Sequence, residues 1–108
     1  MRVDFYGIYR PIVGGKTIEF ELEREATIRA LLNAVVTRFP SLRVELLDRA
    51  GQLYPWIPLY VNGRNPRLWA EGLDRPIGTT DVLSIFSPIS SGKINVEEAN
   101  QSQGDQTR

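Results

Sequence analysis

The chain of 108 residues contains neither cysteine nor histidine. Their absence excludes the usual zinc, iron–sulfur and copper ligand sets, and it also excludes catalysis by a thiol or an imidazole. Carboxylates remain available for acid–base chemistry, and glutamates occupy alternate positions from Glu19 to Glu25. Because residues two apart on a strand share one face, we interpret these glutamates as a solvated outer face rather than as a catalytic pair.

The chain also lacks an excess of charge of either sign, since 13 basic residues balance 13 acidic ones. A balanced charge gives no electrostatic reason to expect binding to nucleic acid or to an anionic membrane surface. No apolar run approaches the roughly 18 residues of a membrane span, and the N-terminus lacks a charged region followed by an apolar targeting segment. We therefore expect one small cytoplasmic domain with no nucleic-acid partner and no membrane partner.

Alternation of apolar and polar residues predicts that the chain opens with two antiparallel strands. Residues 2–9 form the first predicted strand, with its apolar side chains facing inward and Asp4 facing outward. Gly14 and Gly15 accept positive φ easily and predict a hairpin turn. Residues 17–22 alternate most clearly of all and predict a second, half-buried strand.

A helix is predicted next, because Thr27 is a suitable N-cap and apolar residues follow it at helical spacing. These apolar residues are Ile28, Leu31, Leu32, Val35 and Phe39. Pro40 ends the predicted helix, since the residue before a proline is pushed out of the helical region. Ser41 is then the candidate N-cap of a second short helix that extends to about residue 47.

A third strand is predicted between two irregular connections. Tyr54 and Trp56 are expected to anchor the first connection to the rest of the domain. Residues 57–61 resume strand composition, and the Asn62-Gly63 pair that follows is the strongest short signal for a tight turn. Residues 64–72 are expected to return briefly as a ribbon, and a further turn precedes the last strand.

The last predicted strand follows Asp81. Alternation places Leu83 and Ile85 on its buried face and leaves Phe86 on the opposite face, where it is available to a partner. Pro88 cannot donate a ladder hydrogen bond, so pairing is expected to end near it. The next residues should then project as a thin extended tail, and they are Ile89, Ser90, Ser91 and Gly92. A plainer alternative is a final strand with a frayed end.

Composition changes abruptly after Gly92. Residues 93–108 contain no aromatic residue and few apolar ones. Such a segment cannot bury enough surface to offset the entropy of ordering it. We therefore predict a folded domain over residues 1–92 and a polar, disordered extension over residues 93–108.

The order of the predicted elements resembles the β-grasp, which is the ubiquitin-like fold. This resemblance implies an α+β protein with a mixed sheet of four to five strands and one main crossing helix. Plant-type ferredoxins share the fold, but their cluster needs cysteine ligands and this chain has none. The ferredoxin branch is therefore excluded.

Several short motifs in the first 92 residues carry a closer resemblance through their order and spacing. They are VDFYG at residues 3–7 with Arg10 and Val13-Gly14, TIRALL at 27–32, VNGR at 61–64, EGLDRPI at 71–77 and DVLSIFSPI at 81–89. Together they resemble the MoaD/ThiS-type sulfur carriers. The nearest branch is that of the molybdopterin-synthase small subunits, with their archaeal ubiquitin-like modifier relatives.

The resemblance implies a function for the tail. In that family an E1-like adenylyltransferase uses ATP to adenylate the terminal glycine carboxylate, which corresponds to Gly92, and the product becomes a thiocarboxylate or is joined to a lysine. The thin tail of Pro88, Ile89, Ser90 and Ser91 would thread through the activating site, where glycine permits close approach. The carrier itself is not an enzyme and binds no cofactor. Its implied partners are the E1-like enzyme and a molybdopterin-synthase large subunit or another sulfur acceptor.

The chain departs from the family pattern at its tail. The family ends in Gly-Gly, whereas here Ser91-Gly92 is followed by 16 further residues. A processing protease would have to remove residues 93–108 before Gly92 could act in a sulfur carrier or a ubiquitin-like protein modifier. The alternative is a ubiquitin-like binding module that has lost activation and uses the Phe86 surface. A third reading is that the extension is foreign to the natural protein or belongs to a gene variant.

Overall fold

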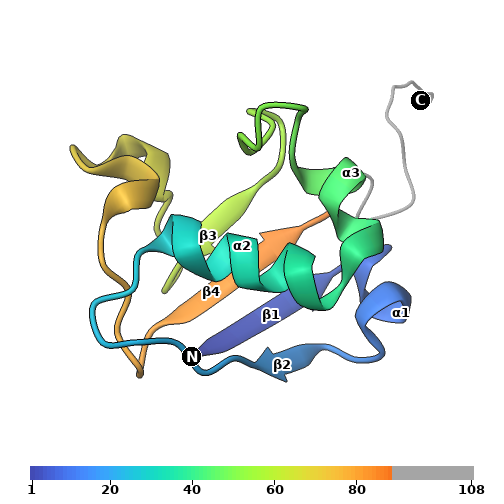
Figure 1. Cartoon of the computed structure of the whole chain (residues 1–108), viewed down its shortest axis with the longest axis horizontal. Coiled ribbons are helices and arrows are strands. Elements are labelled where there is room, and N and C mark those ends of the chain that lie inside the picture. Colours follow the sequence, from blue (N-terminus) through green and yellow to red (C-terminus); the bar gives the residue numbers. More distant parts are fainter. Residues whose placement is uncertain (89–108) are drawn as a thin grey trace, which may run out of the picture.

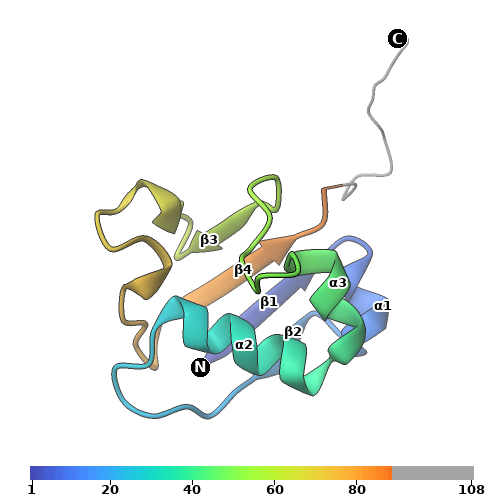
Figure 2. The ribbon, with the colours of Figure 1, turned by 45° about the horizontal axis from the view of Figure 1, so that its top comes forward.

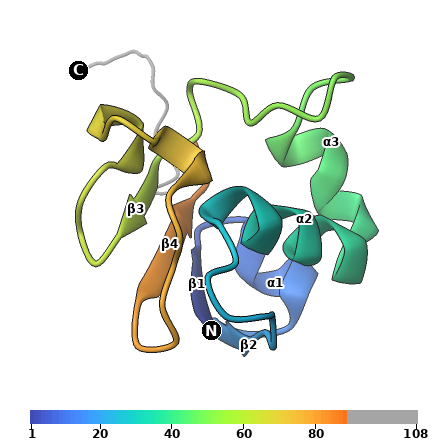
Figure 3. The same cartoon turned by 60° about the vertical axis from the view of Figure 1, so that its left-hand side comes forward.

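The computed structural model of the protein describes residues 1–88. The predictions for Ile89, Ser90, Ser91 and Gly92, and for the 93–108 extension, lie outside this part of the chain. The described residues form one mixed sheet with helices on one of its faces, as Figures 1 and 3 show. None of the helices in this part of the chain is long and apolar enough to cross a lipid bilayer.

The sheet has four strands in the order β2, β1, β4, β3. β1 (Arg2–Tyr6) pairs antiparallel with β2 (Thr17–Glu19) and parallel with β4 (Val82–Phe86). β3 (Leu59–Val61) pairs antiparallel with the other side of β4. The first and last strands of the described chain therefore lie side by side in the middle of the sheet (Figure 1). The predicted mixed sheet is confirmed.

The main helix, α2 (Ile28–Arg38), crosses one face of this sheet (Figure 1). Thr27 is its N-cap, since the Thr27 hydroxyl oxygen accepts a hydrogen bond from the backbone N–H of Ala30 at 3.1 Å. This cap satisfies one of the amides left unpaired in the first turn, as predicted. After α2 the chain passes through the 3-10 helix Pro40–Leu42 into the short α3 (Arg43–Leu46).

The hydrophobic core lies between α2 and the sheet. Val3 and Phe5 of β1 and Leu83 and Ile85 of β4 are all fully buried in one cluster with the apolar stripe of α2. The helical members of that cluster are Ile28, Leu31, Leu32, Val35 and Val36. The predicted buried face of the last strand is therefore confirmed.

The first strand is shorter than predicted, because the helix α1 (Tyr9–Val13) follows it. Tyr9 and Val13 are both buried and lie four residues apart, which is a helical spacing. Gly14 ends α1 in the left-handed conformation, with φ of +83°, and its N–H donates to the Arg10 carbonyl oxygen at 2.9 Å. The predicted Gly14-Gly15 hairpin turn is therefore wrong, since Gly14 serves as a helix C-cap.

Two further predictions near the helices need correction. Ser41 does not cap α3, because the preceding 3-10 helix runs directly into it and Leu42 occupies the N-cap position without a side-chain hydrogen bond. Residues 64–72 do not form a ribbon, because Pro66 cannot donate to a ladder and instead opens the 3-10 helix Pro66–Leu68. A third 3-10 helix, Gly72–Asp74, precedes the last strand.

The connections on either side of β3 differ in how well they were predicted. Asn62 and Gly63 both adopt positive φ, and the Arg64 N–H donates to the Val61 carbonyl oxygen at 3.0 Å, so the predicted tight turn is confirmed. Trp56, in contrast, does not anchor its connection to the core. Its side chain is 60% exposed and stacks on the ring of Tyr54.

Candidate partner-binding surface at the base of the tail

The C-terminal ends of β1 and β4 lie together at the point where the tail begins (Figure 2). Their parallel register pairs Tyr6 with Phe86 and Asp4 with Ser84. These side chains point away from α2, because their neighbours in the strand alternation are buried in the core. The prediction that Phe86 lies on the outer face of the sheet is therefore confirmed.

Three aromatic side chains from three strands meet on this outer face, and we call them the aromatic face: Tyr6, Tyr60 and Phe86. The Phe86 ring stacks on the Tyr6 ring, with centroids 4.2 Å apart and an interplanar angle of 5°. It meets the Tyr60 ring edge to face, with centroids 5.8 Å apart. All three side chains remain partly exposed. Clustered, partly exposed aromatic rings are the kind of surface that supplies binding hot spots.

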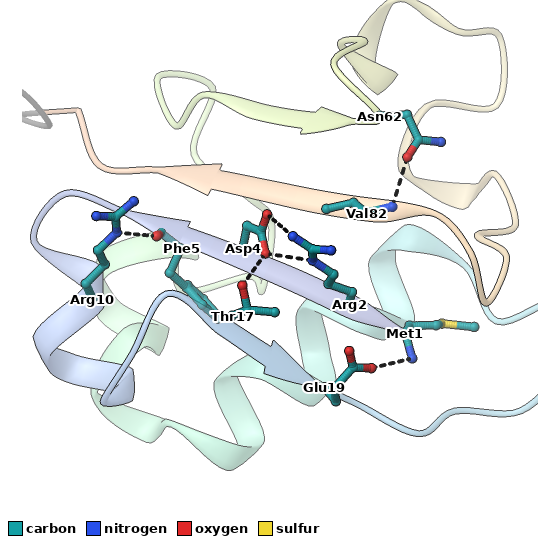
Figure 4. Close-up of polar contacts among 9 residues, drawn as sticks. All are labelled: Met1, Arg2, Asp4, Phe5, Arg10, Thr17, Glu19, Asn62 and Val82. Atoms are coloured by element: carbon teal, nitrogen blue, oxygen red, sulfur yellow. Dashed lines mark hydrogen bonds and ion pairs between the residues drawn. The ribbon is translucent and has the colours of Figure 1, made fainter.

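Two cations border the aromatic face. The guanidinium carbon of Arg10 lies 5.0 Å from the centroid of the Tyr6 ring, and the Lys16 ammonium nitrogen lies 5.7 Å from it. The Arg10 guanidinium is held in place because its Nε donates a hydrogen bond to the Phe5 carbonyl oxygen at 2.9 Å (Figure 4). A partner that presents carboxylates beside apolar side chains would match both features.

The backbone is held in place up to Ser87. The Phe86 N–H donates to the carbonyl oxygen of Pro58, the residue just before β3, at 3.0 Å. Ser87 is only 1% exposed, and its hydroxyl oxygen accepts a hydrogen bond from the Ile8 N–H at 3.3 Å. Pro88 is exposed and follows the last residue of β4 by two positions. The prediction that regular pairing ends near Pro88 is therefore confirmed.

A buried carboxylate supports the same outer face. The Asp4 carboxylate accepts hydrogen bonds from the Arg2 guanidinium at 3.1 and 3.3 Å and from the Thr17 hydroxyl at 2.7 Å (Figure 4). Burial by itself would raise the pKa of Asp4, but these hydrogen bonds and the positive charge of Arg2 outweigh burial and hold the pKa below its usual value. Asp4 therefore stays ionised and ties β1 to β2.

The other end of β4 is fixed by Asn62 and Asp81. The Asn62 side-chain oxygen accepts a hydrogen bond from the Val82 N–H at 2.9 Å (Figure 4), and its amide donates to the Asp81 carboxylate, also at 2.9 Å. The Gly78 N–H donates to the same carboxylate, and these hydrogen bonds lower the pKa of Asp81. The strand that leads to the tail is thus held at both ends.

Sequence reasoning identified Phe86 but missed Tyr6, Tyr60 and Ser87. The alternation of β1 and β3 does assign Tyr6 and Tyr60 to the outer face, but only the strand order and register bring them to Phe86. Ser87 gave no local signal, because its partner, Ile8, lies 79 residues away in the sequence. Within residues 1–88 no group of three or more acidic side chains is placed to hold a metal ion.

The fold and the tail position can be compared with known proteins. A family model described as "ThiS family" matches residues 3–92. The chain belongs to the ThiS family. This match covers every helix and strand described above except Arg2, the first residue of β1, and it ends at Gly92. The protein is thus a member of a family of small ubiquitin-like sulfur carriers and modifiers, which are not themselves catalysts.

Individual relatives of this ThiS-family chain agree with that assignment. It is 33% identical over 75 residues to a protein of Archaeoglobus fulgidus named for an inferred sulfur-carrier function, covering 68% of this chain and 84% of the relative. It is 24% identical over 92 residues to small archaeal modifier protein 3 of Haloferax volcanii, covering 85% of this chain and 98% of the relative.

Solved structures of related proteins share the fold. The crystal structure of small archaeal modifier protein 1 from Haloferax volcanii superposes with a TM-score of 0.72 at 26% identity, covering 85% of this chain and 98% of that one. A chain from the crystal structure of the Amycolatopsis orientalis BexX/CysO complex superposes with a TM-score of 0.65 at 27% identity, covering 78% of this chain and 90% of that one. The predicted β-grasp fold is therefore confirmed.

Proposed function

We propose that this protein is a sulfur carrier whose Gly92 carboxylate, once residues 93–108 are removed, is activated by an E1-like enzyme and converted to a thiocarboxylate. The observation that carries the proposal is that the family match ends at residue 92, although the chain continues for 16 further residues. The position of β4 supports it, because the strand that leads to Gly92 ends beside the aromatic face.

The chemistry requires a free glycine carboxylate. An oxygen of the Gly92 carboxylate attacks the α-phosphorus of ATP in the active site of the partner enzyme, and pyrophosphate leaves. A sulfide-level nucleophile delivered by a partner then adds to the acyl carbon, and AMP leaves, which yields the thiocarboxylate. In the full chain the Gly92 carbonyl belongs to the peptide bond with Lys93, so it offers no carboxylate oxygen for the first step.

The described geometry suits a partner that binds the folded domain and also takes the tail into its active site. The chain is anchored up to Ser87, and the five residues from Pro88 to Gly92 can span at most about 17 Å at roughly 3.4 Å per residue. A partner that covers the aromatic face can therefore place its active site within that distance of the anchor. Phe86 is the residue that we expect such a partner to bury.

A ubiquitin-like modifier is the second candidate function. It is favoured because relatives with 24% and 28% identity are named small archaeal modifier proteins 3 and 1. The two functions share the acyl-adenylate and differ in the nucleophile, since a lysine amine that displaces AMP forms an isopeptide bond. The molybdopterin-synthase large subunit as sulfur acceptor, the processing protease and the cytoplasmic location stay predictions.

The test compares the full chain with a chain that ends at Gly92. Each is mixed with the E1-like enzyme of its host and ATP, and ATP–pyrophosphate exchange reports the acyl-adenylate. We expect ATP–pyrophosphate exchange with the chain that ends at Gly92 and none with the full chain. In the shorter chain, Gly92→Val should abolish exchange through steric exclusion from the activating site, while Ser91→Gly should accelerate it by removing a Cβ from the narrow channel.

Two outcomes decide between the alternatives. If the chain ending at Gly92 is inert with every E1-like enzyme of its host and Ser91→Gly does not rescue it, the carrier proposal fails and the binding-module alternative replaces it. The intact mass of the protein from its own host separates the two active functions. A species that ends at Gly92 with one oxygen replaced by sulfur indicates a sulfur carrier, whereas covalent conjugates to lysines indicate a modifier.

A further inference from the structure

A shallow groove beside α3 is separate from the aromatic face. It has a volume of about 370 Å³, and we call it the α3 groove. Its lining includes Arg43, Val44, Leu47, Asp48, Arg49 and Tyr54. All of these residues belong to α3 or to the connection that follows it, so the groove lies at the start of the segment that leads to β3.

The α3 groove is bordered by apolar surface that no described residue covers. Val44 is 73% exposed and Trp56 is 60% exposed. The Trp56 ring stacks on the Tyr54 ring that lines the groove, with centroids 4.5 Å apart and an interplanar angle of 13°. An exposed cluster of large apolar side chains on a small domain commonly marks a site that another segment or molecule covers.

The charged residues that line the α3 groove restrict which kind of segment can bind there. Arg43 and Arg49 line the groove, and neither forms an ion pair with another residue in the described part of the chain. The nearby Asp48 carboxylate already accepts hydrogen bonds from the Ala50 and Gln52 N–H groups, both at 2.9 Å. The groove therefore favours an occupant with apolar side chains followed closely by carboxylates.

One segment of this chain outside the described residues has that composition. Residues 94–98 read Ile-Asn-Val-Glu-Glu, so two apolar side chains share one side of an extended strand and two carboxylates follow them. The described chain that precedes this segment also passes near the connection that carries Trp56. The Phe86 N–H bonds to the Pro58 carbonyl oxygen, two residues from Trp56, and Ile94 lies eight residues beyond Phe86, within a reach of roughly 27 Å.

We propose that residues 94–98 dock in the α3 groove of their own chain. Ile94 and Val96 cover the rings of Tyr54 and Trp56, and the two glutamates lie beside Arg43 and Arg49. A short tether gives the segment an effective concentration on the order of millimolar, so even a weak contact is occupied much of the time. The extension then covers a second surface of the domain, and its removal exposes that surface to partners.

Tryptophan fluorescence tests the proposal, because the chain has only two tryptophans. Trp69→Phe leaves Trp56 as the single reporter, and its quenching by acrylamide is compared between the full chain and the chain ending at Gly92. We expect the quenching constant to rise about 1.5-fold to 2-fold on truncation, as suits a contact occupied about half of the time. In the matched pair carrying Trp56→Phe, quenching of Trp69 should be the same at both lengths.

A charge reversal separates specific docking from a general effect of the tail. Glu98→Lys in the full chain should move Trp56 quenching toward the value of the truncated chain, while Asp105→Lys, the same charge change outside the segment, should not. Equal quenching at both lengths would overturn the proposal, and so would protection of Trp56 that disappears on dilution, because a second copy would then cover the groove. The readout needs no activating enzyme, so its outcome does not depend on the carrier function.

Discussion

Asp4 in β1 and Ser87 just after β4 are buried polar residues, with only 5% and 1% of their surfaces exposed. Burying such groups is unfavourable unless they are hydrogen-bonded, and both are. The partners of Asp4 lie on β1 and β2, and the partner of Ser87 lies just after β1. Asp4 thus ties β1 to β2, and Ser87 ties the end of β4 to the residues that follow β1.

Asp4→Asn should destabilise the protein at neutral pH by about 1.5–3 kcal/mol, because it removes the charge from a buried hydrogen-bonded carboxylate. Urea unfolding of both proteins measures the difference. Glu21→Gln is the matched control, since Glu21 is exposed and its loss of charge should change stability little. A loss of stability in the control as large as that in Asp4→Asn would contradict this reasoning.

The difference in stability between the natural protein and Asp4→Asn should also depend on pH. Because the pKa of Asp4 is lower in the folded protein than its usual value, the ionised carboxylate contributes stability above the unfolded pKa, which lies near 3.9. This contribution is lost as the pH falls through the folded pKa. The stability difference between the natural protein and Asp4→Asn should therefore be full at pH 7 and shrink as the pH is lowered below about 4.

Phe86→Ala should weaken binding to the activating enzyme strongly while costing the isolated domain only about 1–2 kcal/mol, because the ring is partly exposed and loses its stacking on Tyr6. Ile85→Ala, on the other face of the same strand, should cost about 2–5 kcal/mol through the cavity that it leaves. Thermal unfolding and a binding titration measure both. If Phe86→Ala proves as destabilising as Ile85→Ala while binding is unchanged, Phe86 is a structural residue.

At the scale of elements, the adjacent glycines after α1 have different roles. Gly14 has φ of +83° as the C-cap, whereas Gly15 does not have positive φ, and an added Cβ would contact nothing at either position. Gly14→Ala should therefore cost about 1–2 kcal/mol from backbone strain alone. Gly15→Ala should be neutral or slightly stabilising. Equal effects in urea unfolding would contradict the helix-cap assignment.

The elements that the sequence predicted well are those with a long or unambiguous local pattern. α2 has a capping threonine and several turns of apolar spacing, and β4 has a clear alternation before Pro88. α1 escaped prediction because its five residues give only one helical repeat, Tyr9 to Val13, and Tyr9 also fits the alternation of a strand. The aromatic face was not predicted because no short stretch of sequence specifies the register between strands that are distant along the chain.

At the scale of the whole molecule, the core that the structure describes is built from the strands and helices of residues 1–88. Among these residues its last member along the chain is Ile85, and Pro88 is exposed. The chain ending at Gly92 should therefore unfold in urea within about 0.5 kcal/mol of the full chain and with a similar dependence on urea concentration. A large loss of stability on truncation would show that the extension belongs to the folded core.

The position of β4 also determines when the sheet can form. It lies between β1 and β3, and its pairing with β1 joins Tyr6 to Phe86, which are 80 residues apart. Contacts between such distant residues carry a large loop-closure cost and slow folding. Until residues 82–86 are available, the β1–β2 pair and β3 remain apart with unpaired edges that other chains can bind. During synthesis this sheet therefore closes in one late step, and the nascent chain is vulnerable to aggregation until its last strand has emerged.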